Sequence, residues 1–265
     1  MNGNRVIEET RQSFRVGEIG NEREISLRTV SGRSPGVIWL GGFRSDMTGT
    51  KAEAMMRWAF ERGVSGIRFD YSGHGDSGGE FEQGSISKWL EETLAVFLRF
   101  TVGPQIIIGS SMGGWIALRL IQRLQELNEN HRVLGLVLIA PAADFTSALM
   151  EPGFSEIQRA LLATQGYFEQ VSEYSDEPLI ITQKLIEDGR KNSILGQPLN
   201  TDCPVHIIQG RLDPDVPYQH ALRLIELLGE DDVSLSMISD GDHRLSRPEY
   251  LELLTSVLDG MIANV

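Results

Sequence analysis

Cysteine is almost absent from the sequence: Cys203 is the single one in 265 residues. One thiol cannot form an internal disulfide framework or a metal site built from several cysteines. Cys203 stands just before an apolar run, which is typical of a buried structural thiol. No other pair of ligand residues has the spacing of a metal site. We therefore expect neither a metal ion nor a cofactor.

Long apolar runs are also missing. No stretch approaches the roughly 20 residues that a membrane-spanning helix needs. The first ten residues, MNGNRVIEET, lack the apolar centre of a secretion signal. The sequence therefore predicts a protein without a membrane span and, by default, a cytoplasmic location.

Basic residues are outnumbered, with 24 Lys and Arg against 37 Asp and Glu and a net charge of −13. Because phosphate backbones are bound by basic patches, this balance argues against a nucleic-acid partner. A hydrophobic content of 41% is ordinary for a globular protein, and the length suits one large α/β domain. The oligomeric state cannot be predicted from these features.

What the chain does contain is a distinctive stretch at 105–120, QIIIGSSMGGWIALRL. The run Ile106–Ile108 is typical of a strand buried on both faces, and apolar residues at helical spacing begin at Trp115. The sequence Gly109-Ser110-Ser111-Met112-Gly113 therefore lies where a strand turns into a helix. This is the context of a G-x-S-x-G nucleophile elbow, although an ordinary glycine-rich turn is the alternative for this stretch alone.

Steric reasoning selects the serine. In a strained turn, side chains two residues before and after the nucleophile would collide with the strand and the helix. Ser111 has Gly109 and Gly113 at these positions, whereas Ser110 has Ile and Met. Ser111 is therefore the candidate nucleophile.

Strands and helices alternate along most of the chain, which predicts α/β architecture with a mostly parallel central sheet flanked by helices. Residues 11–30 are expected to form one or two antiparallel edge strands, and 32–36 a turn. The other expected strands are Val37–Leu40, Ile67–Phe69, Val133–Ile139, Val205–Ile208 and Val233–Ile238. The expected helices are 48–62 with an N-cap at Thr48 or Thr50, 86–100, the elbow helix to about 128, 217–229 and 247–262.

Residues 141–200 break this alternation. They contain helical patches around 155–165 and 178–188, separated by several prolines and glycines. We interpret them as a small helical cap or lid, inserted within a single domain of residues 1–265. An irregular connection is the alternative.

A serine nucleophile needs a base, and in the elbow architecture the chain order is Ser, then Asp or Glu, then His. His243 follows the last expected strand, in a loop before the last helix, where a base can reach the elbow. The other histidines come too early or lie inside an element. His74 lies in a glycine-rich loop and is expected to be structural.

The carboxylate that orients the base should follow the strand Val205–Ile208. Asp213 and Asp215 both do, and Asp213 is favoured because it is closer to the strand end. Asp215 could instead serve as a turn or cap residue of the next helix.

The oxyanion of an acyl-transfer intermediate needs two N–H donors. We expect one from Met112, which follows the nucleophile. The other is expected from Phe43, where the preceding Gly41-Gly42 allows the backbone to approach closely.

Together these residues resemble the α/β-hydrolase superfamily. The wider likeness is to the branch that contains the mitochondrial palmitoyl-protein thioesterase, also known as the mycophenolic acid acyl-glucuronide esterase. It covers most of the chain except 141–200, and the residues around 41 read Gly-Gly-Phe where many members have His-Gly. The segments that carry it are GGFRSDMTGTKA (41–52), IRFDYSGHGDSGG (67–79), GPQIIIGSSMGGW (103–115), Cys203-Pro204, the 210–217 loop and Asp242-His243-Arg244.

The resemblance implies the α/β-hydrolase fold, a triad of Ser111, Asp213 and His243, and an oxyanion hole from Phe43 and Met112. The expected activity is hydrolysis of a small-molecule acyl ester or thioester, with an acylated protein as a further candidate substrate. The same triad could serve acyl transfer, perhydrolysis or C–C bond hydrolysis. A non-catalytic ligand-binding protein on this fold is the alternative from another class.

Overall fold

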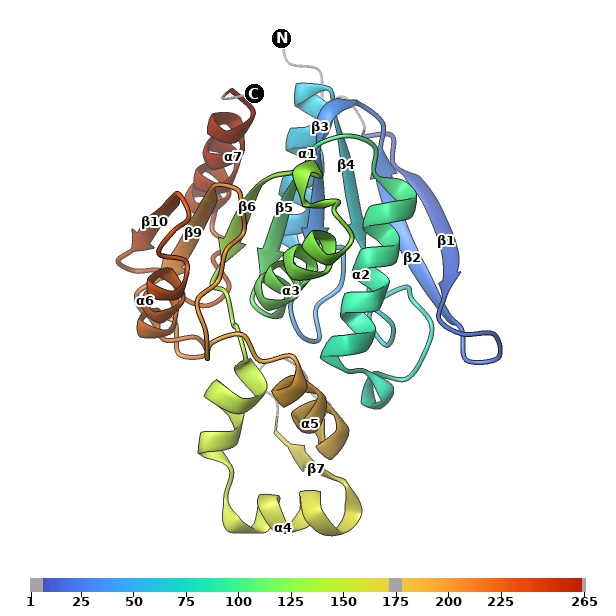
Figure 1. Ribbon diagram of the computed structural model, residues 1–265, viewed down its shortest axis with the longest axis vertical. Helices are drawn as coiled ribbons and strands as arrows, with labels where there is room; N and C mark the ends of the chain where they lie inside the picture. The colour runs from blue at the N-terminus through green and yellow to red at the C-terminus, as the bar shows by residue number, and fades with distance from the viewer. Residues whose placement is uncertain (1–6, 172–177, 264–265) are drawn as a thin grey trace.

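A computed structural model describes residues 7–171 and 178–263, and its centre is a large twisted sheet (Figure 1). None of the described helices is long and apolar enough to span a membrane. The strands of the sheet are β1 (Thr10–Val16), β2 (Arg23–Val30), β3 (Arg33–Leu40), β4 (Val64–Phe69), β5 (Gln105–Ser110), β6 (Val133–Ile139), β9 (Val205–Gly210) and β10 (Val233–Ile238).

The order across the sheet is β1-β2-β4-β3-β5-β6-β9-β10. β2 runs antiparallel to both β1 and β4, and all the remaining neighbours are parallel. The prediction of a mostly parallel sheet is therefore confirmed. β1 lies at an edge as predicted, whereas β2 lies inside the sheet.

Helices cover both faces of the sheet. Alternate residues of β5 point to opposite faces, so Ile107 packs into one core and Ile106 and Ile108 into the other. All three side chains are fully buried, as the β-branched run predicts. The first face is covered by α2 (Ile86–Phe100), α3 (Met112–Glu126) and α6 (Tyr218–Leu227), and the second by α1 (Thr50–Arg62) and α7 (Pro248–Ala263).

Two local predictions were wrong. β3 begins at Arg33, where a turn was expected, because Gly36 permits close packing rather than a reversal. A Cβ on Gly36 would lie 2.4 Å from Ser65 Oγ. The N-cap of α1 is Gly49, without a side-chain bond, because the Thr48 hydroxyl donates instead to the Asp46 carboxylate.

The segment between β6 and β9 projects from the main body (Figure 1). The first predicted helical patch is confirmed as α4. The second begins as a strand, because the stretch Leu179–Thr182, which ends in three β-branched residues, pairs with an earlier strand. The elements of the segment are η3 (Thr146–Met150), η4 (Glu151–Gly153), α4 (Glu156–Gln165), β7 (Tyr167–Gln170), β8 (Leu179–Thr182) and α5 (Gln183–Lys191). Short turns η1 (Phe81–Gln83) and η2 (Asn130–Arg132) lie elsewhere.

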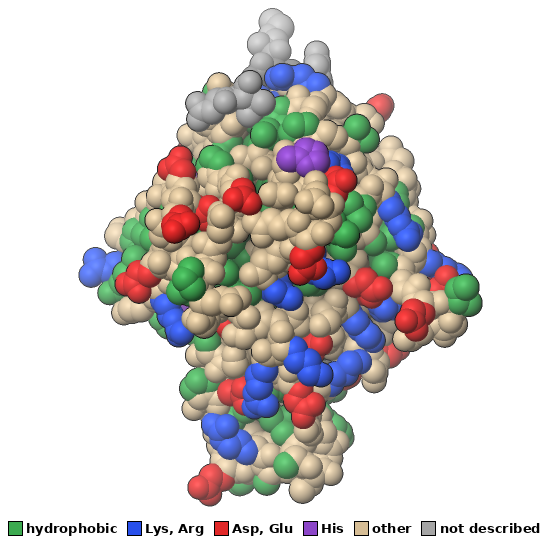
Figure 2. All heavy atoms as spheres, in the orientation of Figure 1, with side chains coloured by type: hydrophobic (Ala, Val, Ile, Leu, Met, Phe, Trp, Pro, Cys, Tyr) green, Lys and Arg blue, Asp and Glu red, His purple; other side chains and the backbone are tan. Residues whose placement is uncertain are grey.

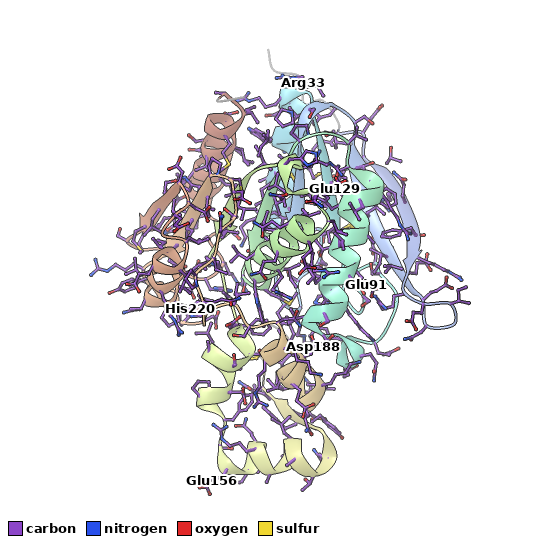
Figure 3. The ribbon with its side chains drawn as sticks, viewed as in Figure 1. Arg33, Glu91, Glu129, Glu156, Asp188 and His220 are labelled. Carbon is purple, nitrogen blue, oxygen red and sulfur yellow. The ribbon has the colours of Figure 1, made fainter. Side chains whose placement is uncertain are left out.

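One carboxylate joins the two ends of this segment. Asp144, directly before η3, accepts hydrogen bonds from Ile194 N at 2.9 Å and Leu195 N at 2.9 Å, and from Ser193 Oγ at 2.5 Å. His220 of α6 lies beside this junction and contacts Ala143 O at 2.7 Å (Figure 3). The chain therefore leaves and re-enters the main body at one place.

The inner part of the segment is fixed to α2. Asp188 of α5 accepts a hydrogen bond from Ser87 N at 2.8 Å, at the start of α2 (Figure 3). Figure 2 shows Lys and Arg side chains gathered where the segment meets the main body. Lys88 and Lys184 both donate to Gln83 O, at 2.9 and 2.8 Å. These polar contacts join α5 to η1 and α2.

The elbow glycines are required by sterics. A Cβ on Gly113 would lie 2.1 Å from Leu40 O, and one on Gly109 would lie 2.4 Å from Gly113 O. Real Cβ atoms do not approach carbonyl oxygens this closely, so β5, the first turn of α3 and the end of β3 can pack together only with glycine. The steric argument from the sequence holds in the structure.

We predict that Gly113→Ala lowers the free energy of unfolding by about 3 kcal/mol or more, because the methyl group overlaps backbone that cannot move independently. Urea denaturation measures this loss. Gly153→Ala is the matched control, since a Cβ there meets nothing within 4 Å. It should change stability by no more than about 0.5 kcal/mol. Equal effects of the two substitutions would contradict the steric explanation.

Candidate active site

Ser111 lies at the turn between β5 and α3 with φ 54° and ψ −118°, a combination that non-glycine residues rarely adopt. Backbone hydrogen bonds hold it there. Ser111 N donates to Ile139 O at 2.9 Å, and Ala142 N donates to Ser111 O at 3.1 Å. The end of β6 thus fixes the strained residue from the side.

The structure brings Ser111, His243 and Asp213 together at one edge of the sheet. His243 Nε2 lies 3.1 Å from Ser111 Oγ, and its Nδ1 lies 2.8 Å from Asp213 Oδ2. Ser111 follows β5, Asp213 follows β9 and His243 follows β10. Parallel strands place their carboxyl ends at the same edge of the sheet. The distances are those of a nucleophile, a base and an orienting carboxylate.

The surroundings of the two candidate carboxylates differ. The Asp213 side chain is fully buried, and its Oδ1 accepts hydrogen bonds from Asp215 N at 2.9 Å and Val216 N at 2.8 Å. Gln209 Nε2 lies 3.4 Å from Oδ2. Asp215 is exposed and uses its backbone to hold Asp213. The arrangement favours Asp213 as the partner of His243.

The two segments predicted to supply oxyanion donors both adjoin Ser111. Met112 is the first residue of α3, where N–H groups have no partner within the helix. On the other side, both Ser111 Cβ and Ser45 Oγ lie 3.4 Å from the place that a Cβ on Gly42 would take. The loop that contains Phe43 therefore packs directly against the elbow.

His74 fixes the peptide that follows Phe43. Arg44 N donates to His74 Nε2 at 3.2 Å, so the Nδ1 atom carries the proton and donates to Ser72 O at 3.2 Å. Burial lowers the pKa of His74 from 6.5 to about 4, which keeps the ring neutral. The structural role expected for His74 is consistent with these contacts, and its link to the Phe43 loop could not be inferred from sequence spacing.

The remaining histidines and the cysteine are occupied elsewhere. His206 contacts Ser234 and Ser236 on β10, and His131 contacts Asn128 O. Cys203 is buried as predicted, and burial raises the pKa of its thiol to about 11. Among the described residues, none of these groups interacts with Ser111.

Asp213, Asp215 and His243 also form a group whose ligand atoms lie within 4.8 Å of one another. The His243 Nδ1 proton lies between Nδ1 and Asp213 Oδ2, so a metal ion would have to break that hydrogen bond. The arrangement suits proton transfer better than metal binding. The absence of a metal ion stays a prediction.

A cavity of about 410 Å³ lies between the Phe43 loop and the projecting segment. Arg44, Ser45 and Asp46 form one side, and Pro178 and Ile180 of the segment form another. Arg44 Nη1 also donates to Pro178 O at 3.4 Å. The segment between β6 and β9 therefore contributes a wall to a cavity at residues 44–46, directly after Phe43.

Known proteins are similar in sequence to this chain. The family model described as serine aminopeptidase, S33, matches residues 45–178. Human mitochondrial palmitoyl-protein thioesterase ABHD10 is 30% identical over 239 residues, which cover 90% of this chain and 76% of the human protein. The predicted resemblance is thereby confirmed. Its expected limit was wrong, because the family model and the relative both match residues within 141–200, where no likeness was expected.

Solved structures agree. Mouse alpha/beta hydrolase domain-containing protein 10 superposes with a TM-score of 0.84 at 28% identity, over 96% of this chain and 99% of that chain. A crystal structure from Agrobacterium vitis S4, provisionally assigned as a hydrolase, superposes with a TM-score of 0.93 at 53% identity, over the same shares of the two chains. The predicted fold class is therefore confirmed.

We predict that His74 makes stability depend on pH. Its pKa is lowered in the folded protein, so the unfolded chain binds more protons between about pH 4 and 6.5, and acid favours unfolding. From about pH 7.5 to about pH 5, the wild type should lose about 2 kcal/mol more than His74→Gln, which stays neutral. Urea denaturation at both pH values tests this. Parallel pH dependences would show that His74 is not held neutral by burial.

Proposed function

Because the chain belongs to the α/β-hydrolase family, we propose that it is a serine hydrolase of carboxylic esters or thioesters. The observation that carries this proposal is the continuous hydrogen-bonded path from Ser111 Oγ through His243 to the buried Asp213. The names of the human and mouse relatives, a thioesterase and a hydrolase, support the reaction class.

In the proposed reaction, His243 Nε2 accepts the proton of Ser111 as Oγ attacks the acyl carbon. Asp213 holds the imidazole in the required tautomer and stabilises its charged form. The N–H groups of Phe43 and Met112 stabilise the oxyanion. His243 then gives its proton to the departing alcohol or thiol. A water molecule next attacks the acyl-enzyme while His243 accepts its proton. His243 returns that proton to Ser111 Oγ as the acid leaves.

We propose residues 141–200 as a cap that shapes the acyl pocket. The apolar residues of this segment pack mainly with one another: Leu162 and Phe168 are buried, and Phe154 and Leu161 pack against them. Tyr167 is exposed. These residues therefore hold the cap together, and the wall beside the elbow comes from other rings.

Two rings follow residues that contact the elbow: Phe43 comes directly after Gly42, and Phe145 comes shortly after Ala142. Their centroids lie 5.3 Å apart, and Phe145 also packs edge-on against Trp115 of α3 at 5.7 Å. Phe145 lies three residues after Ala142, whose N–H binds Ser111 O. We propose that an acyl chain extends along these two rings. A cytoplasmic location and the class of natural substrate, small molecule or acylated protein, stay predictions.

We predict that a fluorophosphonate probe forms an adduct at Ser111, located by mass spectrometry of the digested protein. Ser111→Ala and His243→Ala should both abolish labelling, because the first lacks the nucleophile and the second lacks its base. Ester hydrolysis should fall about ten-thousandfold or more in each. Ser110→Ala is the matched control. It removes the hydroxyl next to Ser111, and the hydrogen bond of His243 Nε2 is to Ser111 Oγ.

Labelling at Ser110 would refute the assignment of the nucleophile. A folded protein that neither reacts with the probe nor hydrolyses p-nitrophenyl esters and acyl thioesters would instead fit a ligand-binding protein on this fold.

We predict that Phe145→Ala shifts the acyl preference towards longer chains, because removing the ring widens the space beside Phe43. The ratio of kcat/KM for p-nitrophenyl octanoate over butanoate should rise about fivefold or more. Phe100→Ala is the control, since its ring packs on Phe14 at the opposite side of the fold. An unchanged ratio in Phe145→Ala would remove this ring from the acyl pocket.

A further inference from the structure

Lys51 is a half-buried amine close to the triad with no part in the proposed chemistry. It stands in the first turn of α1, and its Nζ donates a hydrogen bond to Arg244 O. Desolvation of an ammonium group is costly, and here burial lowers the pKa of Lys51 from 10.5 to about 8. We therefore expect this lysine to have a role that offsets the cost of burying its amine.

The loop that Lys51 contacts is the one that carries His243. Its first part is held by β9 and the turn that follows, because Leu212 N donates to Gly241 O at 2.9 Å and a Cβ on Gly210 would lie 2.5 Å from that same oxygen. Its last part is held by Leu245, which is 2% exposed and packs into the core beneath α1 and α7. Between these two anchors lie only three residues.

The Lys51 bond falls within this gap, at the residue directly after His243. It comes from an element on the other side of the nucleophile. α1 follows the Phe43 loop and β3, whereas His243 follows β10, and β5 lies between β3 and β10 in the sheet order. The Lys51 side chain therefore connects the oxyanion side of the site to the base side.

The charge of Lys51 lies among groups of the two loops that hold the imidazole. The charged residues that face the amine are Asp242 and Arg244 from the His243 loop and Asp213 from the loop after β9. The amine is therefore placed between the loop that carries His243 and the loop that carries its carboxylate partner.

We propose that Lys51 is a positioning residue, which holds His243 at the distance needed for proton transfer from Ser111 by anchoring the Arg244 carbonyl. This inference rests on the proposed function, because His243 must act as the base for its position to matter.

The test compares Lys51→Met, Lys51→Gln and Lys51→Arg with the wild type, using p-nitrophenyl butanoate. Arg132→Met is the matched control, because Arg132 is another half-buried cation that donates to a backbone carbonyl, Thr101 O at 2.9 Å, and it lies directly before β6, at the strand ends opposite to the triad. Each rate is corrected by subtracting the hydrolysis rate that remains in Ser111→Ala. Thermal unfolding of every variant shows which remain folded at the assay temperature.

We expect Lys51→Met to lower kcat by about tenfold to a hundredfold with KM changed less than about threefold, since a displacement of about 1 Å at a base costs this much. Lys51→Gln keeps a hydrogen-bond donor, so its kcat should fall less. It also replaces Lys51→Met in the test if the Met variant does not fold. Lys51→Arg should regain most of the rate. The control variant Arg132→Met should leave both kcat and KM within about twofold of the wild type.

Two results would overturn the inference while leaving the proposed function intact. One is an unchanged kcat in the folded Lys51→Met and Lys51→Gln variants. The other is a fall in kcat that follows the loss of thermal stability, with KM changed as much as kcat and no recovery in Lys51→Arg. A wild type without any Ser111-dependent hydrolysis would overturn both the function and the inference.

Discussion

The strained backbone of Ser111 is the constraint on which the site depends. A serine at φ 54° between a strand and a helix is held only because its glycine neighbours let β3, β5 and α3 approach to contact distance. The same packing that requires Gly113 also places Leu40 and the following glycines against the nucleophile. The same backbone contacts therefore fix both the packing of the core and the position of the Ser111 hydroxyl.

Around this fixed point the site is assembled from three loops by hydrogen bonds to backbone groups. Asp213 is oriented by the amides of Asp215 and Val216, and the peptide after Phe43 is oriented by neutral His74. Each functional side chain thus has a second group that limits its freedom. Preorganisation of this kind is the main source of electrostatic stabilisation in acyl-transfer sites.

The parts of this arrangement that local sequence encodes could be predicted. The Ile106–Ile108 run specified a buried strand, and chain order pointed to His243. Contacts between distant segments could not be predicted, because no local pattern encodes them. Lys51 reads as an ordinary helix residue until α1 is placed beside Arg244, and Gly36 reads as a turn until β3 is seen against Ser65. The strand β8 was missed because its pairing with β7 outweighs the helical spacing of the residues that follow.

The Asp144 junction has a consequence for how such a protein can change. Since one carboxylate holds residues 193–195 beside the end of β6, the chain between them forms a loop that is closed independently of its own contents. For such a loop the entropy of closure rises by only about 0.6 kcal/mol for each doubling of length. Insertions, deletions or wholesale exchange within the segment would therefore cost the sheet and the elbow little. Substrate range and catalytic machinery can evolve as separate modules of one chain.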